Sequence, residues 1–295
     1  VGSSGKSTTL RVVAAALGVP SSDTTTYNAW GSVSSAVRRI VPGQRHAVIE
    51  VGIADKGQMR RYSRVVRPDV TVVTSVGSEH HRSLGTLDVT RDEKAWMVRA
   101  LPSDGVAVLN GDDPNVVWMA GETCARVVTF GFGTACDVRA DDVHINWPNG
   151  TRFLLTAFGE SRCVTPRLIG RHMVYPALAA IAVAHLEREA MTAFAATATR
   201  IALRQAGAEL LEQFGRPLDS QQQPQDLLAV GMGKGGAGEL NVSSDLDLIF
   251  VFREQGETEG VPGGSGELRP GSRISTGEFM HRLARRAINL LSEVT

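Results

Sequence analysis

Two clusters of glycine, hydroxyl and charged residues have the composition of phosphate-binding sites. The first cluster opens the chain and consists of Gly2, Ser3, Ser4, Gly5, Lys6, Ser7 and Thr8. Glycines there let backbone N–H groups approach phosphate oxygens, while Lys6 supplies positive charge and Ser7 a hydroxyl for Mg²⁺. Glu50 ends an apolar run, where a buried carboxylate needs a cation or a water. The alternatives are a plain glycine-serine turn before a helix and a solvent-exposed Glu50.

The second cluster joins a glycine loop to two aspartates. It consists of Gly231, Gly233, Lys234, Ser243, Ser244, Asp245 and Asp247. Because side chains alternate along a strand, an apolar strand over residues 246–252 would place both aspartates on one side, where Mg²⁺ offsets their repulsion. With the loop amides and Ser243 or Ser244 against a triphosphate, this arrangement predicts nucleotidyl transfer. The alternative is an exposed Asp-x-Asp pair at a strand edge or turn.

The elements around the first cluster predict an α/β fold. Apolar, β-branched runs predict strands at residues 46–51, 70–76, 105–109 and 126–130, and amphipathic runs predict helices at 10–17 and 90–101. Their alternation favours a P-loop-type, mainly parallel sheet with helices on both faces. Residues 137–165 alternate apolar and polar side chains, which predicts an antiparallel hairpin or meander joined to the sheet.

The chain is predicted to form two domains. Residues 1–186 are a nucleotide-binding domain that lacks the strand normally preceding a P-loop, and residues 187–295 are a small α+β nucleotidyltransferase-like domain that is truncated at its end. The alanine-rich stretch after Pro176 runs to residue 206 without glycine or proline, which suggests two abutting helices. The glutamine-rich residues 220–225 are typical of an exposed turn before a strand at 227–230, and residues 277–292 predict a final helix.

Composition excludes several classes of protein. The 295 residues are 42% hydrophobic and 21% charged, and 31 basic residues balance 31 acidic ones, so no overall charge attracts nucleic acid or an anionic membrane. Cys124, Cys136 and Cys163 lack the paired spacing of a disulfide framework or zinc site. No stretch reaches the ~20 apolar residues of a membrane span. We therefore expect a cytoplasmic protein.

Ordered motifs over residues 1–186 resemble the central ATPase domain of the Mur ligases. Besides the opening loop they are Val48-Ile49-Glu50-Val51-Gly52, Glu79-His80, Leu84-Gly85-Thr86-Leu87, Glu93-Lys94, Leu109-Asn110-Gly111-Asp112-Asp113 and Gly170-Arg171-His172. Within that family the chain looks similar to the branch that adds a dipeptide to a UDP-muramoyl peptide in peptidoglycan biosynthesis. The resemblance implies ATP-dependent amide formation through an acyl-phosphate.

The same resemblance implies roles for single residues. Lys6 would hold the β- and γ-phosphates, and Ser7 and Glu50 would serve one Mg²⁺. His80 would ligate a second Mg²⁺ together with Lys94, which matches a lysine that is carbamylated in the family. Asn110 and His172 would face the adenine.

Residues 188–295 resemble the catalytic core of glutamine synthetase adenylyltransferase. The motifs are Gly231-Met232-Gly233-Lys234 and Glu239-Leu240-Asn241-Val242-Ser243-Ser244-Asp245-Leu246-Asp247-Leu248-Ile249-Phe250. The resemblance implies transfer of AMP from ATP to a tyrosine of glutamine synthetase, with Asp245 and Asp247 carrying the metals. The sequence therefore predicts an ATP- and Mg²⁺-dependent fusion of two enzyme modules. The alternative is a non-catalytic chimeric or truncated fragment, at most a nucleotide-binding module.

Overall fold

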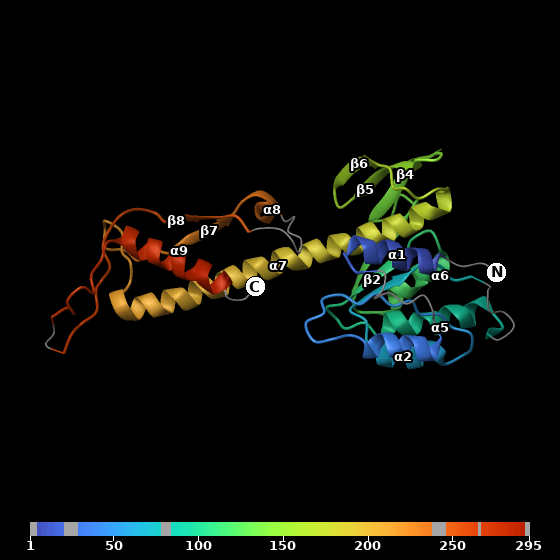
Figure 1. The fold of residues 1–295 in the computed structure, drawn as a ribbon, viewed down its shortest axis with the longest axis horizontal. Coiled ribbons are helices and arrows are strands. Elements are labelled where there is room, and N and C mark those ends of the chain that lie inside the picture. The colour runs from blue at the N-terminus through green and yellow to red at the C-terminus, as the bar shows by residue number, and fades with distance from the viewer. Residues whose placement is uncertain (1–4, 21–28, 78–83, 238–245, 265–266, 293–295) are drawn as a thin grey trace. The chain divides into compact units, whose positions relative to one another are not determined.

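The chain divides into two compact units, Val1–His185 and Leu186–Thr295. The computed structural model describes residues 5–20, 29–77, 84–237, 246–264 and 267–292 (Figure 1). The boundary between the units falls inside helix α7 (Val174–Phe214). The alanine-rich stretch is thus one helix rather than two abutting ones, since alanine is the strongest helix former and no glycine or proline interrupts it before Gly207.

Unit 1 is built on a six-stranded sheet whose strands follow the order of the chain, β1 to β6. The strands are β1 (Val70–Val73), β2 (Val106–Asn110), β3 (Arg126–Gly131), β4 (Val138–Asn146), β5 (Gly150–Ala157) and β6 (Glu160–Val164). The pairs from β1 to β4 are parallel, and β4, β5 and β6 form an antiparallel meander. Both the mainly parallel sheet and the antiparallel extension predicted at 137–165 are confirmed.

Helices cover the sheet of unit 1. They are α1 (Lys6–Ala16), α2 (Trp30–Arg38), α3 (Gln58–Val66), α5 (Leu87–Arg99) and α6 (Pro114–Val117), with 3₁₀ turns at Trp118–Glu122 and Arg171–Met173. In Figure 1, α1 lies on one side of β2, and α5 and α2 lie on the other. Ala95 and Val98 of α5 are fully buried against Ala107 and Leu109 of β2, so the apolar stripe of α5 forms the core under the sheet.

The strand predicted at residues 46–51 is wrong in extent. Only Ile49 forms a single β-bridge there, and the flanking residues are irregular. A strand needs a continuous ladder of backbone hydrogen bonds on at least one side. Within the described residues β1 pairs only with β2, and no continuous ladder includes residues 46–51.

Unit 2 packs the later part of α7 against a second helix, α9 (Thr276–Ser292). Their shared core is formed by Ala202, Ala206, Leu210, Phe214, Phe279, Met280, Leu283 and Ala287. Strands β7 (Leu228–Gly231) and β8 (Leu248–Val251) form an antiparallel pair, and the short helix α8 (Gly233–Gly236) follows β7. Over the described ranges of the whole chain, no helix is long and apolar enough to cross a membrane.

Candidate functional site

The start of α1 has the local features of an anion-binding helix N-terminus. Gly5 is the N-cap and has a positive φ of 72°, a conformation that glycine adopts without strain. Among the described residues no side chain caps this helix, and its first turn carries no acidic residue. Its N-terminal amides therefore favour an anion. Lys6, Ser7 and Thr8 lie half-buried on this turn, whereas Gly2, Ser3 and Ser4 fall outside the described residues.

Ser7 contacts Glu50 directly. The Ser7 hydroxyl donates a hydrogen bond of 2.6 Å to Oε2 of Glu50, a residue 43 positions further along the chain. The Glu50 side chain is buried, with only 7% of its surface exposed. A hydroxyl and a carboxylate side by side at the start of a phosphate-binding helix are oxygen ligands of the kind that Mg²⁺ prefers.

The carboxyl ends of β1 and β2 gather the second group of predicted residues. Nζ of Lys94, on α5, donates to the carbonyl of Ser75 at 3.0 Å. The Asn110 amide donates to the carbonyl of Thr74 at 2.8 Å, and its oxygen accepts the Asp112 N–H at 3.0 Å. The nitrogen and the oxygen of this amide therefore both bond to backbone groups that follow β1 and β2. The contact of Asn110 with adenine stays a prediction.

No motif in the sequence singled out Asp112 by itself, yet its carboxylate joins three segments of unit 1. It accepts the N–H groups of Phe132 at 2.6 Å and Gly133 at 2.8 Å, and the hydroxyl of Tyr175 at 2.9 Å. Burial, and then the bond to Asp112, raises the pKa of Tyr175 to about 12. A Cβ on Gly131 would lie 2.6 Å from the Asp112 carboxylate, so only glycine leaves room for Asp112 there. This glycine at the end of β3 is the one sequence feature that could have indicated the contact.

His172 lies at the entrance to α7, in the 3₁₀ turn Arg171–Met173, and is exposed. Its ring stands over Gly170, where a Cβ would come within 2.8 Å of Cε1. The Arg171 guanidinium covers the Phe132 ring at 4.3 Å from the ring centroid, and Phe132 packs edge-on against Tyr175 at 4.9 Å between ring centroids. An exposed imidazole beside an aromatic pair is compatible with a nucleobase, although its role stays a prediction.

Only some of the predicted metal ligands of unit 1 lie within the described residues. His80 lies outside the described ranges, and within them no group of three or more His, Cys, Asp or Glu side chains could hold a metal ion. Two open hollows in unit 1, of about 460 and 260 Å³, are lined by residues other than Lys6 and Ser7. The smaller hollow lies beside Lys56 and Glu93. The structure joins Ser7 to Glu50 and leaves the second magnesium site a prediction.

The glycine loop of unit 2 meets Asp247. Gly233 has a φ of 53°, and a Cβ on it would lie 3.4 Å from Oδ2 of Asp247. The Met232 N–H donates to the Asp247 carbonyl at 2.9 Å. A Cβ on Gly236 would lie 2.5 Å from the carbonyl oxygen of Gly231, so this tight turn requires glycine. Lys234 is exposed on α8.

The strand predicted to carry both aspartates is shorter than expected. Strand β8 begins at Leu248, and the exposed Asp247 lies just before it, bonded to Met232, which lies between β7 and α8. Ser243, Ser244 and Asp245 fall outside the described residues, so the common side of Asp245 and Asp247 stays a prediction.

Comparison with known proteins relates the two parts of the chain to two different families. The family model of the Mur ligase middle domain matches residues 1–184, and that of glutamate-ammonia ligase adenylyltransferase matches residues 170–295. The chain is 30% identical over 184 residues to UDP-N-acetylmuramoyl-tripeptide--D-alanyl-D-alanine ligase of Bacillus subtilis, covering 61% of this chain and 39% of the relative. It is 47% identical over 107 residues to the bifunctional glutamine synthetase adenylyltransferase/adenylyl-removing enzyme of Ralstonia nicotianae, covering 36% of this chain and 10% of the relative.

A solved structure agrees with the fold of unit 1. The UDP-N-acetylmuramoylalanyl-D-glutamyl-2,6-diaminopimelate--D-alanyl-D-alanyl ligase of Acinetobacter baumannii superposes with a TM-score of 0.55 and 26% identity, covering 62% of this chain and 41% of that one. The chain thus spans well under half of each relative, and a tenth of the adenylyltransferase. It belongs to the Mur ligase family through a middle domain at residues 1–184, and its residues 170–295 match the model of the glutamate-ammonia ligase adenylyltransferase family.

Proposed function

We propose that unit 1 binds ATP with Mg²⁺ at the start of α1 and serves a Mur-type ligation, in which a substrate carboxylate is activated for amide formation. The bond of 2.6 Å between the Ser7 hydroxyl and the buried Glu50 carboxylate carries this proposal. A buried carboxylate is costly unless charge or hydrogen bonds compensate it, and a cation beside Ser7 would do so.

The residues of unit 1 have separate tasks in this proposal. The first-turn amides of α1 and the Lys6 ammonium hold the terminal phosphates, and Ser7 and Glu50 hold the metal. A Mg²⁺ held by Ser7 and Glu50 would offset the negative charge of the phosphates. Lys94, fixed to the Ser75 carbonyl, lies on α5 and would act as a second metal ligand after carbamylation. His172 offers an exposed imidazole to the base.

The substrate class follows from the relatives. The Bacillus subtilis relative is named for a UDP-N-acetylmuramoyl-tripeptide and D-alanyl-D-alanine. We propose a UDP-muramoyl-peptide as the carboxylate substrate of the complete ligase to which this middle domain is related. A cytoplasmic site of action agrees with the three cysteines, which are all free thiols.

Titration of the full chain with ATP, with and without Mg²⁺, tests the site in unit 1. Lys6→Ala and Glu50→Gln should each weaken Mg²⁺-dependent binding roughly 10- to 100-fold, since each removes a charge-assisted contact. Lys56→Ala, at an exposed lysine away from α1, is the matched control. ADP release measured on the same variants reports turnover. Equal binding by the parent chain and Lys6→Ala would rule out the site.

For unit 2 we propose an adenylyltransferase-type site, in which the glycine loop and Asp247 hold Mg²⁺-ATP and AMP passes to a protein tyrosine. The closeness of Gly233 to the Asp247 carboxylate supports it, because a triphosphate held by the loop would lie near a metal held by Asp247. Glutamine synthetase is the proposed acceptor, following the name of the Ralstonia nicotianae relative.

Transfer of label from α-labelled ATP to glutamine synthetase tests the second activity. Asp245→Ala and Asp247→Ala should abolish any transfer, and Asp226→Ala, at an exposed aspartate in the same unit, should not. Transfer that survives both substitutions would refute the assignment.

A second candidate is nucleotide binding without catalysis. It rests on the start of α1 and the Ser7–Glu50 contact alone, and it assigns no transfer step to either unit. Mg²⁺-dependent ATP binding, together with neither ADP release nor AMP transfer, would identify this case.

A further inference from the structure

The β7–β8 hairpin positions Asp247, but its connection does not fix which residues pair. The register is Leu228 opposite Val251, Ala229 opposite Phe250, Val230 opposite Ile249 and Gly231 opposite Leu248. A tight turn sets the register of most hairpins through its type and length. Here residues 232–247 connect the strands, so the connection is too long to do so.

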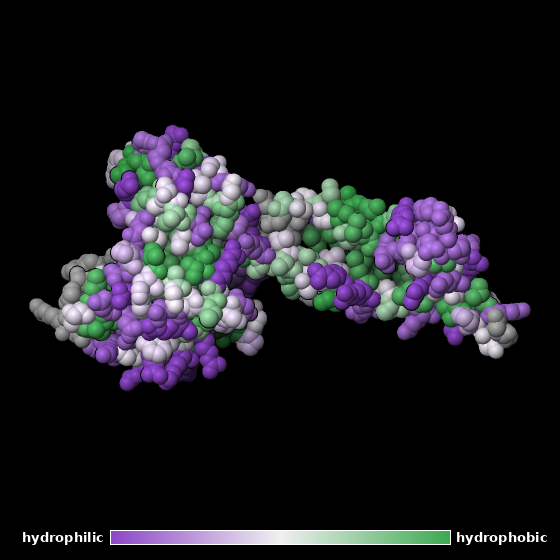
Figure 2. All heavy atoms as spheres, turned by 180° about the vertical axis from the view of Figure 1, so that it is seen from behind, coloured by the Kyte–Doolittle hydropathy of each residue, from purple (hydrophilic) through white to green (hydrophobic). Residues whose placement is uncertain are grey.

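The hydrophobic pattern specifies the register only weakly within the hairpin, because apolar side chains lie on both of its faces. Leu228, Val230, Ile249 and Val251 share one face and are 64%, 38%, 49% and 46% exposed. Figure 2 shows hydrophobic side chains gathered on this surface of unit 2. Leu227 and Phe252 flank the hairpin and pack on the α7–α9 core. A slip of one residue would exchange this face with the one that carries Ala229, Leu248 and Phe250, which is apolar as well.

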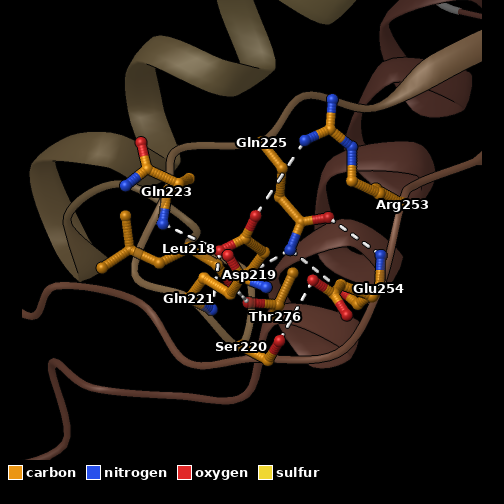
Figure 3. Close-up of polar contacts among 9 residues, drawn as sticks. All are labelled: Leu218, Asp219, Ser220, Gln221, Gln223, Gln225, Arg253, Glu254 and Thr276. Atoms are coloured by element: carbon orange, nitrogen blue, oxygen red, sulfur yellow. Dashed lines mark hydrogen bonds and ion pairs between the residues drawn. The ribbon is translucent and has the colours of Figure 1, made fainter.

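A glutamine side chain pairs the open end of the hairpin instead (Figure 3). Gln225 stands three residues before Leu228, and Glu254 stands three residues after Val251, so the register places them opposite each other. Nε2 of Gln225 donates to the Glu254 carbonyl at 2.8 Å, and Oε1 accepts the Glu254 N–H at 3.2 Å. One side-chain amide thus satisfies both backbone groups of Glu254, as a paired strand residue would.

The Gln225 side chain is itself held in place. It is 7% exposed, and Nε2 also donates to the Leu218 carbonyl at 3.0 Å. That carbonyl accepts the hydroxyl of Thr276, the first residue of α9, at 2.7 Å. Oδ1 of the buried Asp219 accepts the N–H groups of Gln221 and Gln223 at 2.9 and 2.8 Å, which closes the loop around Gln225. The amide is therefore fixed relative to α9 and can hold Glu254 at one position.

We propose that Gln225 is a positioning residue that sets the register of β8 and so places Asp247 beside Gly233. The importance of Asp247 rests on the proposed function of unit 2, whereas the register itself does not. Replacement of the amide removes two hydrogen bonds to the Glu254 backbone that only the native register allows, and so lowers the preference for that register.

Cysteine pairs in the full chain test the register. Ala229→Cys with Phe250→Cys reports the native register, and Ala229→Cys with Val251→Cys reports a slip of one residue. Each pair is combined with Gln225→Leu, which keeps the size but not the hydrogen bonds, or with Gln223→Leu as the matched control. The Gln223 side chain is exposed in the same loop. Disulfides formed under mild oxidation are mapped by mass spectrometry of peptides.

The control should form the native cross-link like the parent chain. In Gln225→Leu the ratio of native to slipped cross-link should fall by about tenfold, the change expected when buried hydrogen-bonding groups lose their partner. An unchanged ratio would overturn the proposal. If Gln225→Leu does not fold, refolding with the Ala229→Cys, Phe250→Cys pair oxidised should restore helix content, and failure to do so would show general support of the core instead.

Binding of Mg²⁺ and ATP separates the two proposals. The native disulfide should restore Asp247-dependent ATP binding to Gln225→Leu, a rescue that a merely structural role would not give. If the parent chain binds no ATP in unit 2, the proposed function fails while the cross-linking result stands.

Discussion

Replacement of Tyr175 by phenylalanine tests the contact of Asp112 with the start of α7. The Tyr175 hydroxyl donates to the Asp112 carboxylate at 2.9 Å, and the ring packs edge-on against Phe132. Tyr175→Phe keeps the ring and removes only the hydrogen bond. A hydrogen bond to a charged group contributes about 1.5–3 kcal/mol, and partial exposure of the site lowers this to about 1 kcal/mol.

The pKa of Tyr175 gives the prediction a pH dependence of known sign. The pKa rises from 10.0 to about 12, first through burial and then through the bond to Asp112. Because the folded pKa exceeds the unfolded one, the stabilisation is complete below pH 10 and is lost as the pH rises toward 12. Two pKa units correspond to at most about 2.7 kcal/mol, which solvent screening reduces to about 1 kcal/mol.

Tryptophan fluorescence during guanidinium unfolding measures this difference. All four tryptophans, Trp30, Trp96, Trp118 and Trp147, lie in residues 1–185, so the signal reports unit 1 alone. Tyr62, whose pKa is also raised by burial, is common to both variants and cancels in the comparison. The parent chain should be more stable by about 1 kcal/mol at pH 8, and the difference should vanish near pH 12. A difference that is zero at pH 8, or that stays constant to pH 12, would refute the role of the hydroxyl.

Three further predictions concern other parts of the fold. Leu283→Ala removes a side chain that is 7% exposed in the α7–α9 core, so it should lower the free energy of unfolding of unit 2 by about 3 kcal/mol, measured by far-ultraviolet circular dichroism. Thr86→Ala removes the cap that accepts the Val89 N–H, and it should cost about 1 kcal/mol in the tryptophan assay, whereas Thr86→Ser should not. The bond to Arg286 lowers the pKa of Glu209, so this pair should stabilise unit 2 at neutral pH and lose its effect as the pH falls through that pKa. Arg286→Ala should return the Glu209 pKa toward 4.5 in an NMR titration, and an unchanged pKa would exclude the ion pair.

The elements with regular periodicity could be predicted from the sequence. The β-branched runs that became β1, β2 and β3, and the alternation that became β4 to β6, are local patterns that burial in a sheet enforces. Residues 46–51 have the same composition but form only a single β-bridge at Ile49, which no local pattern reveals. The first cluster was partly recoverable as well, because glycine, lysine and serine at the start of α1 are contiguous.

Contacts between distant residues could not be predicted in the same way. Asp112 meets Tyr175 from 63 residues away, and Gln225 meets Glu254 from 29 residues away. The glutamines at 221–223 are exposed as expected of a turn, yet Gln225 in the same run is buried. Composition cannot tell which of several like residues faces inward, because that depends on where the chain returns.

The β6 edge of the unit 1 sheet and the β7–β8 pair of unit 2 differ in their tendency to recruit another chain. Strand β6 ends the sheet of unit 1 with exposed Glu160 and Arg162, and charged side chains on an open edge discourage intermolecular strand addition. The β7–β8 pair shows aliphatic side chains instead, without such protection among them. If the protein aggregates during expression or storage, we expect fibril-like association to begin in unit 2, and lysine at Ile249 to delay it.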